Sequence, residues 1–394
     1  MNVQTMLATQ AQQALAHQSG DYVSKDVDEQ AYIQELMDLN GLETVYRFDI
    51  GKNTDGVTPL IRGMLTLPEL ADTVTRNIVE YPDNHFRHLK RQIAMRHGID
   101  PQWLAFGAGL ESVIDQICRA VIEPDDKALI PVPNFSVFED MSRRCGAEIL
   151  PVSTSPPDYR WTAMTTRKIV EHLHRDLPKV IWISNPVNPT GQYLPLSVIN
   201  EVCENALHTG TLVVVDEAYG EYADRDDAVV SASRLLQEHP HLMVLRTFSK
   251  MYALPSARVG YLMCSTPELL RAVDAFRPTF PLPWSSLHTA QIAIMDDPYV
   301  CACRRRTEQR RKRLLPELES ITGIVPISSQ TNTVMFRHRS LPARELADRL
   351  AAKGFLTANL NNVTGIENRG FLRMTVRSGA ENALFVKALA AVAN

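Results

Sequence analysis

The feature of this sequence that most constrains its fold is an alternation of short apolar runs with longer amphipathic stretches. Continuous apolar runs of this length are typical of parallel strands that are buried on both faces of a sheet. Strands that alternate with helices form βαβ units, so the pattern predicts an α/β fold. The runs that we expect to form strands lie in residues 127–133, 179–184, 211–219, 242–250 and 258–264.

Amphipathic stretches lie before and between these runs. In residues 85–97, 112–122 and 196–207, apolar side chains recur at the spacing of one helix face. Each of these stretches therefore predicts a helix that packs one face against the sheet.

The C-terminal part of the chain has a different pattern and predicts a smaller α+β domain. Strand candidates lie at residues 333–338 and 371–376. Helix candidates lie at residues 342–353, which end at Gly354, and at residues 382–393.

The length of 394 residues is enough for two or three domains. We expect an N-terminal arm with part of the small domain in residues 1–55, a large domain in residues 56–285 and a small C-terminal domain in residues 286–394. The boundary between the large and small domains is expected in a long helix after Pro283.

Charge and composition exclude several classes of protein. The 41 basic and 45 acidic residues give a net charge of −4, which removes the electrostatic argument for a nucleic-acid partner. A signal peptide would begin with lysine or arginine residues, and none precedes Lys25. We therefore expect no signal peptide. No apolar stretch approaches the length of a membrane span, so we expect a cytoplasmic protein without a membrane partner.

The six cysteines do not have the spacing of a zinc site, so we expect free thiols and no metal. The densest charge run, residues 304–315, is open to two interpretations. It forms either a basic patch or the solvated face of a long helix, and the acidic balance of the chain favours the solvated face.

Lys250 follows an apolar run and stands among hydroxyl groups. By itself, it could be an ordinary surface lysine. A lysine that forms a Schiff base with a cofactor needs a nearby anchor for the cofactor phosphate. Thr247 and Ser249 can donate hydrogen bonds to that phosphate, and Arg258 can pair with it.

Asp216 ends another apolar run, at the edge of an α/β sheet where ligands bind. It could cap a helix, or its carboxylate could pair with a protonated pyridine nitrogen and keep the ring able to accept electrons. Tyr219, three residues later, is either a core tyrosine or a donor to the phenolic oxygen of the same ring.

Three further motifs have both a structural and a functional interpretation. The Asn-Pro steps of residues 184–191 form a rigid turn that could hold the Asn188 amide toward the phenolic oxygen. The glycines that end at Gly109 form a plain turn or a phosphate cradle before a helix. Phe135 belongs to the core or faces the cofactor, and Tyr81 is an exposed aromatic residue in a turn.

Together these motifs resemble the fold-type I pyridoxal-phosphate enzymes, in particular the class I and II aminotransferases similar to histidinol-phosphate aminotransferase. The resemblance extends from about Tyr81 to Arg373. It implies a large domain with a mostly parallel, seven-stranded sheet, a smaller α+β domain, and an enzyme of amino acid metabolism that uses pyridoxal 5′-phosphate. The motifs are Tyr-Pro-Asp, Gly-x-Gly before a helix, Pro-x-Phe, Asn-Pro-x-Asn-Pro-Thr-Gly, Asp-Glu-Ala-Tyr, Thr-Phe-Ser-Lys, and an arginine eight residues after the lysine.

The resemblance also implies a role for each motif. Lys250 forms the Schiff base and transfers the proton, and Asp216 pairs with the pyridine nitrogen. Asn188 and Tyr219 bind the phenolic oxygen. The remaining cofactor contacts implied are stacking by Phe135 and phosphate binding by Thr247, Ser249, Arg258 and the backbone of Gly109 and Leu110.

Two residues extend the implied site beyond the cofactor. Arg373 matches the arginine that binds the α-carboxylate of the substrate through two hydrogen bonds. Tyr81 matches a tyrosine that reaches the phosphate in the neighbouring subunit, which implies a homodimer with shared active sites.

Three segments depart from the histidinol-phosphate aminotransferase pattern. Residues 48–56 replace an Asn-Glu-Asn-Pro stretch, and residues 277–284 replace an Arg-Pro-Pro-Tyr-Asn stretch. Ala358 stands where an arginine that helps to hold the substrate phosphate would fall. Each change alters the substrate pocket and leaves the cofactor site intact, so we expect an amino acid substrate other than histidinol phosphate.

The sequence leaves the reaction open. Residues 252–255, Tyr-Ala-Leu-Pro, also resemble the threonine-phosphate decarboxylases, and the same cofactor and lysine serve decarboxylation, elimination and cyclisation. A pyridoxal-phosphate domain fused to a transcription regulator is not expected, because the arm before residue 55 is too short and too poor in basic residues for a DNA-binding module.

Overall fold

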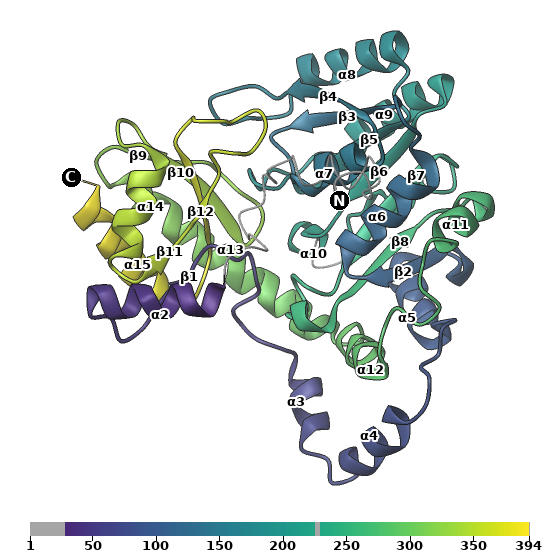
Figure 1. The fold of residues 1–394 in the computed structure, drawn as a ribbon, viewed down its shortest axis with the longest axis horizontal. Coiled ribbons are helices and arrows are strands. Elements are labelled where there is room, and N and C mark those ends of the chain that lie inside the picture. The colour runs from purple at the N-terminus through teal and green to yellow at the C-terminus, as the bar shows by residue number, and fades with distance from the viewer. Residues whose placement is uncertain (1–27, 225–228, 394) are drawn as a thin grey trace, which may run out of the picture.

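A seven-stranded sheet forms the centre of the large part of the molecule (Figure 1). The computed structural model describes residues 28–224 and 229–393. The strand order is β2-β8-β7-β6-β5-β3-β4, and only the pairs that involve β8 are antiparallel, so the predicted α/β fold with a mostly parallel sheet is confirmed. The strands are β2 (Leu104–Ala108), β3 (Lys127–Val132), β4 (Glu148–Ser153), β5 (Val180–Ser184), β6 (Leu212–Asp216), β7 (Leu242–Thr247) and β8 (Val259–Met263).

The direction of β8 was predicted wrongly. This strand runs antiparallel to both of its neighbours, β7 and β2. A parallel pair requires a crossover of a dozen or more residues. The connection from β7 to β8, residues 248–258, contains one three-residue helical turn (η4, Pro255–Ala257), so the chain returns beside β7 in the opposite direction.

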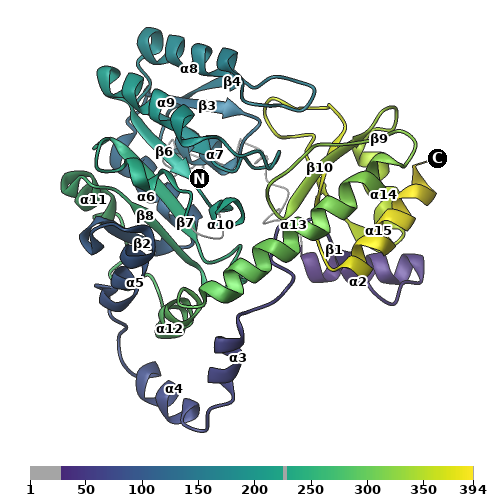
Figure 2. The ribbon, with the colours of Figure 1, turned by 180° about the vertical axis from the view of Figure 1, so that it is seen from behind.

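Helices cover both faces of this sheet (Figures 1 and 2). Side chains alternate along each strand, so Val213 and Val215 of β6 face one apolar core while Leu212 and Val214 face the other. Helices α6, α7 and α11 contribute to the second core, and α5, α8, α9 and α12 contribute to the first. The bounds are α5 (Arg87–His97), α6 (Leu110–Val121), α7 (Val137–Arg144), α8 (Ala163–Asp176), α9 (Leu196–Thr209), α10 (Gly220–Ala223), α11 (Pro267–Asp274), α12 (Trp284–Ala293), η2 (Pro101–Trp103) and η3 (Ala232–Leu235).

A smaller antiparallel sheet, with the order β12-β13-β10-β9, forms the second part of the molecule. Phe48 at the N-terminal side of the chain shares an apolar core with α14 and α15, and β1 pairs in parallel with β11. The N-terminal segment therefore packs with the C-terminal part. The elements are α2 (Glu29–Asn40), β1 (Tyr46–Arg47), β9 (Ile324–Pro326), β10 (Thr333–His338), α14 (Ala343–Ala351), β11 (Phe355–Leu356), β12 (Ala358–Asn359), β13 (Phe371–Thr375) and α15 (Gly379–Val392).

The long helix expected after Pro283 is two helices, α12 and α13 (Asp297–Glu319). The helix is interrupted at Asp296. The side chain of Asp296 accepts a hydrogen bond from the Tyr299 backbone at 3.0 Å and caps a new helix. Pro298 suits the first turn of that helix. We retain the domain boundary near residue 285 as a proposal, with α13 leading from the large sheet to the small one (Figure 2). Residues 1–27 of the expected arm lie outside the described residues.

The interpretation of residues 304–315 as a solvated helix face is wrong for four of its six arginines. Arg304 is buried, and Arg311 donates a hydrogen bond to the Thr331 carbonyl at 2.7 Å. Arg306 and Arg310 bind Asp55. The guanidinium groups of Arg306, Arg310 and Arg311 thus bind the N-terminal segment and the loop before β10, which the local sequence does not reveal.

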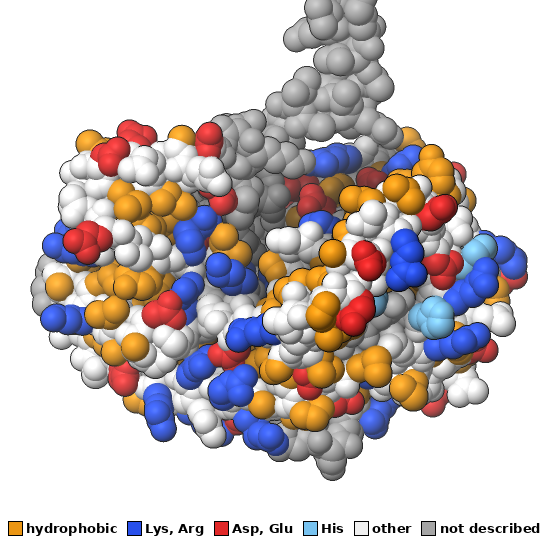
Figure 3. Space-filling model, turned by 90° about the horizontal axis from the view of Figure 1, so that it is seen from below, with side chains coloured by type: hydrophobic (Ala, Val, Ile, Leu, Met, Phe, Trp, Pro, Cys, Tyr) orange, Lys and Arg blue, Asp and Glu red, His pale blue; other side chains and the backbone are white. Residues whose placement is uncertain are grey.

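Two helices, α3 (Pro59–Leu65) and α4 (Leu70–Ile78), project from the body of the molecule (Figures 1 and 2). Figure 3 shows the molecule from the side of these two helices, where hydrophobic side chains are exposed among charged ones.

The six cysteines are free thiols, as expected. Among the helices of residues 28–224 and 229–393, none is both long and apolar enough to cross a membrane.

Candidate active site

The candidate active site is a cavity at the carboxyl ends of the central strands. Ser184, Asp216 and Thr247 are the last residues of β5, β6 and β7, and all three line the cavity. Ligands of α/β sheets bind at this edge. The cavity has a volume of about 220 Å³. The predicted site residues that it brings together are Leu110, Phe135, Asn188, Asp216, Tyr219, Thr247, Ser249, Lys250, Arg258 and Arg373.

Lys250 lies just beyond β7 and faces Tyr219. Its amine nitrogen is 5.2 Å from the centre of the Tyr219 ring. Burial opposes ionisation of Tyr219, but the charges of Lys250 and Arg373 outweigh burial and lower the pKa of the phenol. A phenol of lowered pKa beside a lysine is suited to share hydrogen bonds and protons with an oxygen of a bound ligand.

Asp216 is a buried carboxylate at the end of β6. One of its oxygens accepts a hydrogen bond from the Ala218 backbone at 2.7 Å. Burial raises the pKa of Asp216 to about 7, although that hydrogen bond and the charge of Lys250 act in the opposite direction. A cation held against this carboxylate would offset the cost of burying it, and a protonated pyridine nitrogen is such a cation.

The part of the cavity at Arg258 has the properties of a phosphate site. Gly109 has a φ of +83° and precedes Leu110, the first residue of α6. A Cβ atom on Gly109 would lie 2.3 Å from Nη2 of Arg258, so glycine lets the guanidinium approach the helix start. Thr247 Oγ1 donates to Ser249 Oγ at 3.0 Å. A helix N-terminus, two hydroxyl groups and a guanidinium together favour a phosphate.

Arg373 enters the cavity from β13 of the small sheet and binds the turn of residues 184–191. Its Nη1 donates to Oδ1 of Asn188 at 2.8 Å, and its Nη2 donates to the Asp49 carbonyl at 3.0 Å. With Oδ1 of Asn188 directed at Arg373, the donating Nδ2 is the group of the amide that remains for a ligand. The contact therefore orients Asn188 as a donor and holds the guanidinium at the cavity.

Asp49, Ile50 and Gly51 form a part of the lining that was not predicted from the sequence. A Cβ atom on Gly51 would lie 2.7 Å from the Tyr219 hydroxyl, so glycine lets this segment pass directly over the tyrosine. The available signal was the departure of residues 48–56 from the family pattern, which we connected with the substrate pocket only in general terms. The other lining residues that were not predicted are Glu111, Ser184, Pro186 and Ala218.

Two predicted residues lie outside the cavity lining. Gly109 lies directly beneath Arg258, as described above. Tyr81 is 82% exposed and stacks on Phe280, with 4.6 Å between the ring centres. The structure therefore does not bring Tyr81 to Lys250 within one chain.

The cavity fits pyridoxal 5′-phosphate. Lys250 offers an amine to the aldehyde, Asp216 offers a buried carboxylate to the pyridine nitrogen, and the cradle at Arg258 matches the phosphate. Within residues 28–224 and 229–393, no group of three or more His, Cys, Asp or Glu side chains is placed to hold a metal ion.

The chain is similar in sequence to known proteins over most of its length. A family model with the description "Aminotransferase class I and II" matches residues 43–392. The histidinol-phosphate aminotransferase of Shouchella clausii is 28% identical over 359 residues, which cover 90% of this chain and 91% of that protein.

Solved structures agree at the level of the fold. The histidinol-phosphate aminotransferase of Sinorhizobium meliloti, solved in complex with pyridoxal-5′-phosphate, has a TM-score of 0.78 and 23% identity, and the match covers 94% of this chain and 98% of that one. A decarboxylase from Sulfurospirillum multivorans has a TM-score of 0.81 and 18% identity, and the match covers 100% of this chain and 99% of that one.

Proposed function

The chain belongs to the family of class I and II aminotransferases, and we propose that it transfers the amino group of an amino acid with pyridoxal 5′-phosphate held at Lys250. The observation that carries this proposal is the convergence of Lys250, Asp216 and Arg373 on one cavity that also has a phosphate cradle. When bound, the cofactor supplies a conjugated ring that takes up the electron pair released at the substrate carbon.

The residues of the large sheet hold the cofactor in this proposal. Asp216 keeps the ring nitrogen protonated, because its buried carboxylate is stabilised by an adjacent positive charge. Asn188 and Tyr219 donate to the phenolic oxygen. Phe135 covers the ring, and the phosphate is held by Thr247, Ser249, Arg258 and the backbone at Gly109 and Leu110.

Arg373 and Lys250 act on the substrate. Arg373 binds the α-carboxylate with both of its terminal nitrogens, Nη1 and Nη2, which orients the bonds at the α-carbon relative to the cofactor ring. The Lys250 amine is then free to take the α-proton and return it at the cofactor carbon. Transfer of the amino group to the cofactor requires that the lysine deliver this proton to the cofactor carbon rather than return it to the α-carbon.

We further propose that the substrate carries no phosphate group. Ala358 of β12 is paired with Arg373 of β13, and side chains opposite each other on neighbouring strands have Cβ atoms about 5 Å apart. An arginine at this position would add a second guanidinium beside Arg373, whereas the buried alanine adds none. The cations in the described lining are Lys250, Arg258 and Arg373, and all three are assigned to the cofactor or the α-carboxylate.

The active unit that we propose is a homodimer in which Tyr81 reaches the phosphate of the partner subunit. Tyr81 is exposed and follows the projecting α3 and α4, away from the cavity of its own chain. A second copy that packs against this side would cover both the tyrosine and its neighbour Phe280.

The cytoplasmic location expected from the sequence also stays a prediction.

The test is to mix the protein loaded with pyridoxal phosphate with single amino acids and with histidinol phosphate, in the absence of a keto acid. An aminotransferase loses the visible absorbance of the bound cofactor and releases one equivalent of keto acid, which identifies the donor. The Lys250→Ala variant is expected to bind the cofactor without covalent attachment and to release no keto acid.

Other outcomes lead to other functions. Release of carbon dioxide, ammonia or a cyclised product would assign a decarboxylase or a lyase to the same site. Rapid reaction with histidinol phosphate would contradict the phosphate-free substrate. Normal covalent loading of Lys250→Ala would contradict the role of the lysine.

A further inference from the structure

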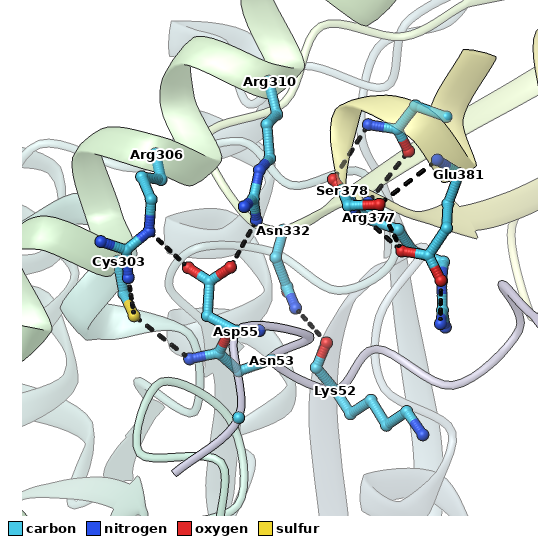
Figure 4. Close-up of polar contacts among 12 residues, drawn as sticks. Lys52, Asn53, Asp55, Cys303, Arg306, Arg310, Asn332, Arg377, Ser378 and Glu381 are labelled. Carbon is cyan, nitrogen blue, oxygen red and sulfur yellow. Dashed lines mark hydrogen bonds and ion pairs between the residues drawn. The ribbon is translucent and has the colours of Figure 1, made fainter. Parts of the chain in front are cut away.

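Residues 48–58, here called the strap, connect the small sheet to the large part of the molecule (Figure 4). The Phe48 carbonyl accepts hydrogen bonds from the backbone N–H and the hydroxyl of Thr375, at 2.7 and 2.9 Å. The Ile50 carbonyl accepts from the same hydroxyl at 2.8 Å, and the Lys52 carbonyl accepts from the Asn332 amide at 3.1 Å. The first half of the strap is therefore held by the small sheet and the loop before it.

This first half is also a wall of the candidate active site. Asp49, Ile50 and Gly51 line the cavity. The Asp49 carbonyl binds Arg373, and Gly51 lies against the Tyr219 hydroxyl. A displacement of the strap would thus disturb the guanidinium that binds the substrate carboxylate and the tyrosine beneath it.

The second half of the strap is held by elements behind the cavity. Asn53 donates to the Met251 carbonyl at 2.7 Å, directly after the lysine of the site. Asp55 accepts from Nε of Arg306 at 2.9 Å and from Nη1 of Arg310 at 2.6 Å. The two arginines lie four residues apart on α13, so they present both guanidinium groups on one helix face (Figure 4).

Asp55 is well shielded from solvent, since its side chain is 10% exposed. Burial opposes its ionisation, but the hydrogen bonds from Arg310 and Arg306 outweigh burial and lower the pKa of the carboxyl group. The carboxylate therefore stays charged at neutral pH. Removal of this carboxylate charge would leave two guanidinium groups without their counter-charge, which costs more than breaking an exposed ion pair.

We propose that Asp55 is a positioning residue for substrate binding, which holds the wall formed by Asp49–Gly51 in place through Arg306 and Arg310. This inference depends on the proposed function, because it assigns the substrate carboxylate to Arg373. Asp55 does not touch the cavity, so its loss changes the affinity for the amino donor rather than the binding of the cofactor.

The test compares Asp55→Asn with a matched control on the same helix. Lys312→Gln breaks the exposed pair between Lys312 and Glu308, which is 2.6 Å long. We expect Asp55→Asn to raise KM for the amino donor roughly tenfold, with kcat and the cofactor dissociation constant within about twofold of the wild type. Asp55→Glu, which keeps the charge, is expected to restore most of the affinity, and Lys312→Gln to change nothing.

A second measurement separates this inference from the proposed function. Hydrogen–deuterium exchange of residues 48–58 in the full-length protein is expected to speed up in Asp55→Asn and not in Lys312→Gln. An active wild type whose KM and exchange are both unchanged by Asp55→Asn would overturn the inference alone. A wild type that does not attach the cofactor at Lys250 would overturn the proposed function, and the exchange rates would still report whether Asp55 holds the strap.

Discussion

Asp216 and Glu217 are consecutive buried acids with different partners. Glu217 accepts a hydrogen bond from Nε of the fully buried Arg246 at 2.9 Å, so its counter-charge is supplied within the protein. Asp216 lines the cavity, where it meets the Ala218 N–H and the field of Lys250. Burying a carboxylate costs free energy unless a cation lies beside it. A bound pyridinium would therefore be stabilised more by Asp216 than by Glu217, which already has a cation as its partner.

The raised pKa of Asp216 predicts a pH dependence of stability in the cofactor-free protein. Between its ordinary value of 3.8 and the folded value of about 7, the folded state binds more protons at this residue than the unfolded state does. Stability from this group is therefore complete below pH 4 and is lost as the pH rises to about 7.

Asp216→Asn removes this titration. We expect the variant to be more stable than the wild type at pH 8 by an amount of about 2–4 kcal/mol, and to lose this advantage near pH 4. Urea unfolding of both cofactor-free proteins at the two pH values measures the difference. An advantage that does not change with pH would contradict the assignment.

At the scale of single elements, the start of α15 is connected to β1 near the other end of the described chain. Ser378 and Glu381 form a capping box at the start of α15, with Glu381 N to Ser378 Oγ at 3.3 Å and Ser378 N to Glu381 Oε2 at 3.2 Å. Arg377 binds Glu381 at 2.6 Å (Figure 4). Arg377 also donates to the Arg47 carbonyl at 2.9 Å. The cap of the last helix therefore also fixes β1, just before the strap.

Ser378→Ala is expected to lower the free energy of unfolding by about 1 kcal/mol, because it leaves the Glu381 N–H in the first turn without its acceptor. Cofactor binding should be unchanged, since Ser378 does not line the cavity. Denaturant unfolding measures the loss. The control is Ser320→Ala at the exposed end of α13, which should cost less than about 0.5 kcal/mol, and equal losses in both variants would argue against the cap.

At the scale of the whole molecule, the projecting helices α3 and α4 bury little against the rest of the chain. Neither α4 nor the turn after it contributes a buried side chain, and the region carries a group of exposed apolar residues on the face seen in Figure 3. Exposed apolar surface of this kind favours association. These residues are Leu60, Leu65, Leu67, Val74, Ile78, Val79 and Tyr81.

Subunit mixing tests whether Tyr81 acts on the partner subunit. Tyr81→Phe and Lys250→Ala homodimers should each be impaired. If Tyr81 acts across the interface, a mixed dimer has one intact site, which combines the lysine of one subunit with the tyrosine of the other. A fully exchanged equal mixture should then recover about a quarter of the wild-type activity. Native mass spectrometry monitors the exchange of subunits. If the subunits exchange and no activity is recovered, Tyr81 acts within its own chain.

The sequence by itself determined the fold class and the cofactor residues that the cavity brings together. Strand and helix periodicity is local, and motifs such as Thr247–Lys250 place their side chains at a strand end without help from distant residues. The break between α12 and α13 was also encoded locally, in Asp296 and Pro298, although we did not predict it.

Only the tertiary structure decided what closes the site. Gly51 meets Tyr219, and Asp55 meets Arg306 and Arg310 across 251 and 255 residues of chain. No local pattern marks such pairs, because an aspartate in a loop and arginines on a charged helix look like ordinary surface residues until the fold brings them together. The direction of β8 depended in the same way on how the chain returns to β7, and not on its apolar composition.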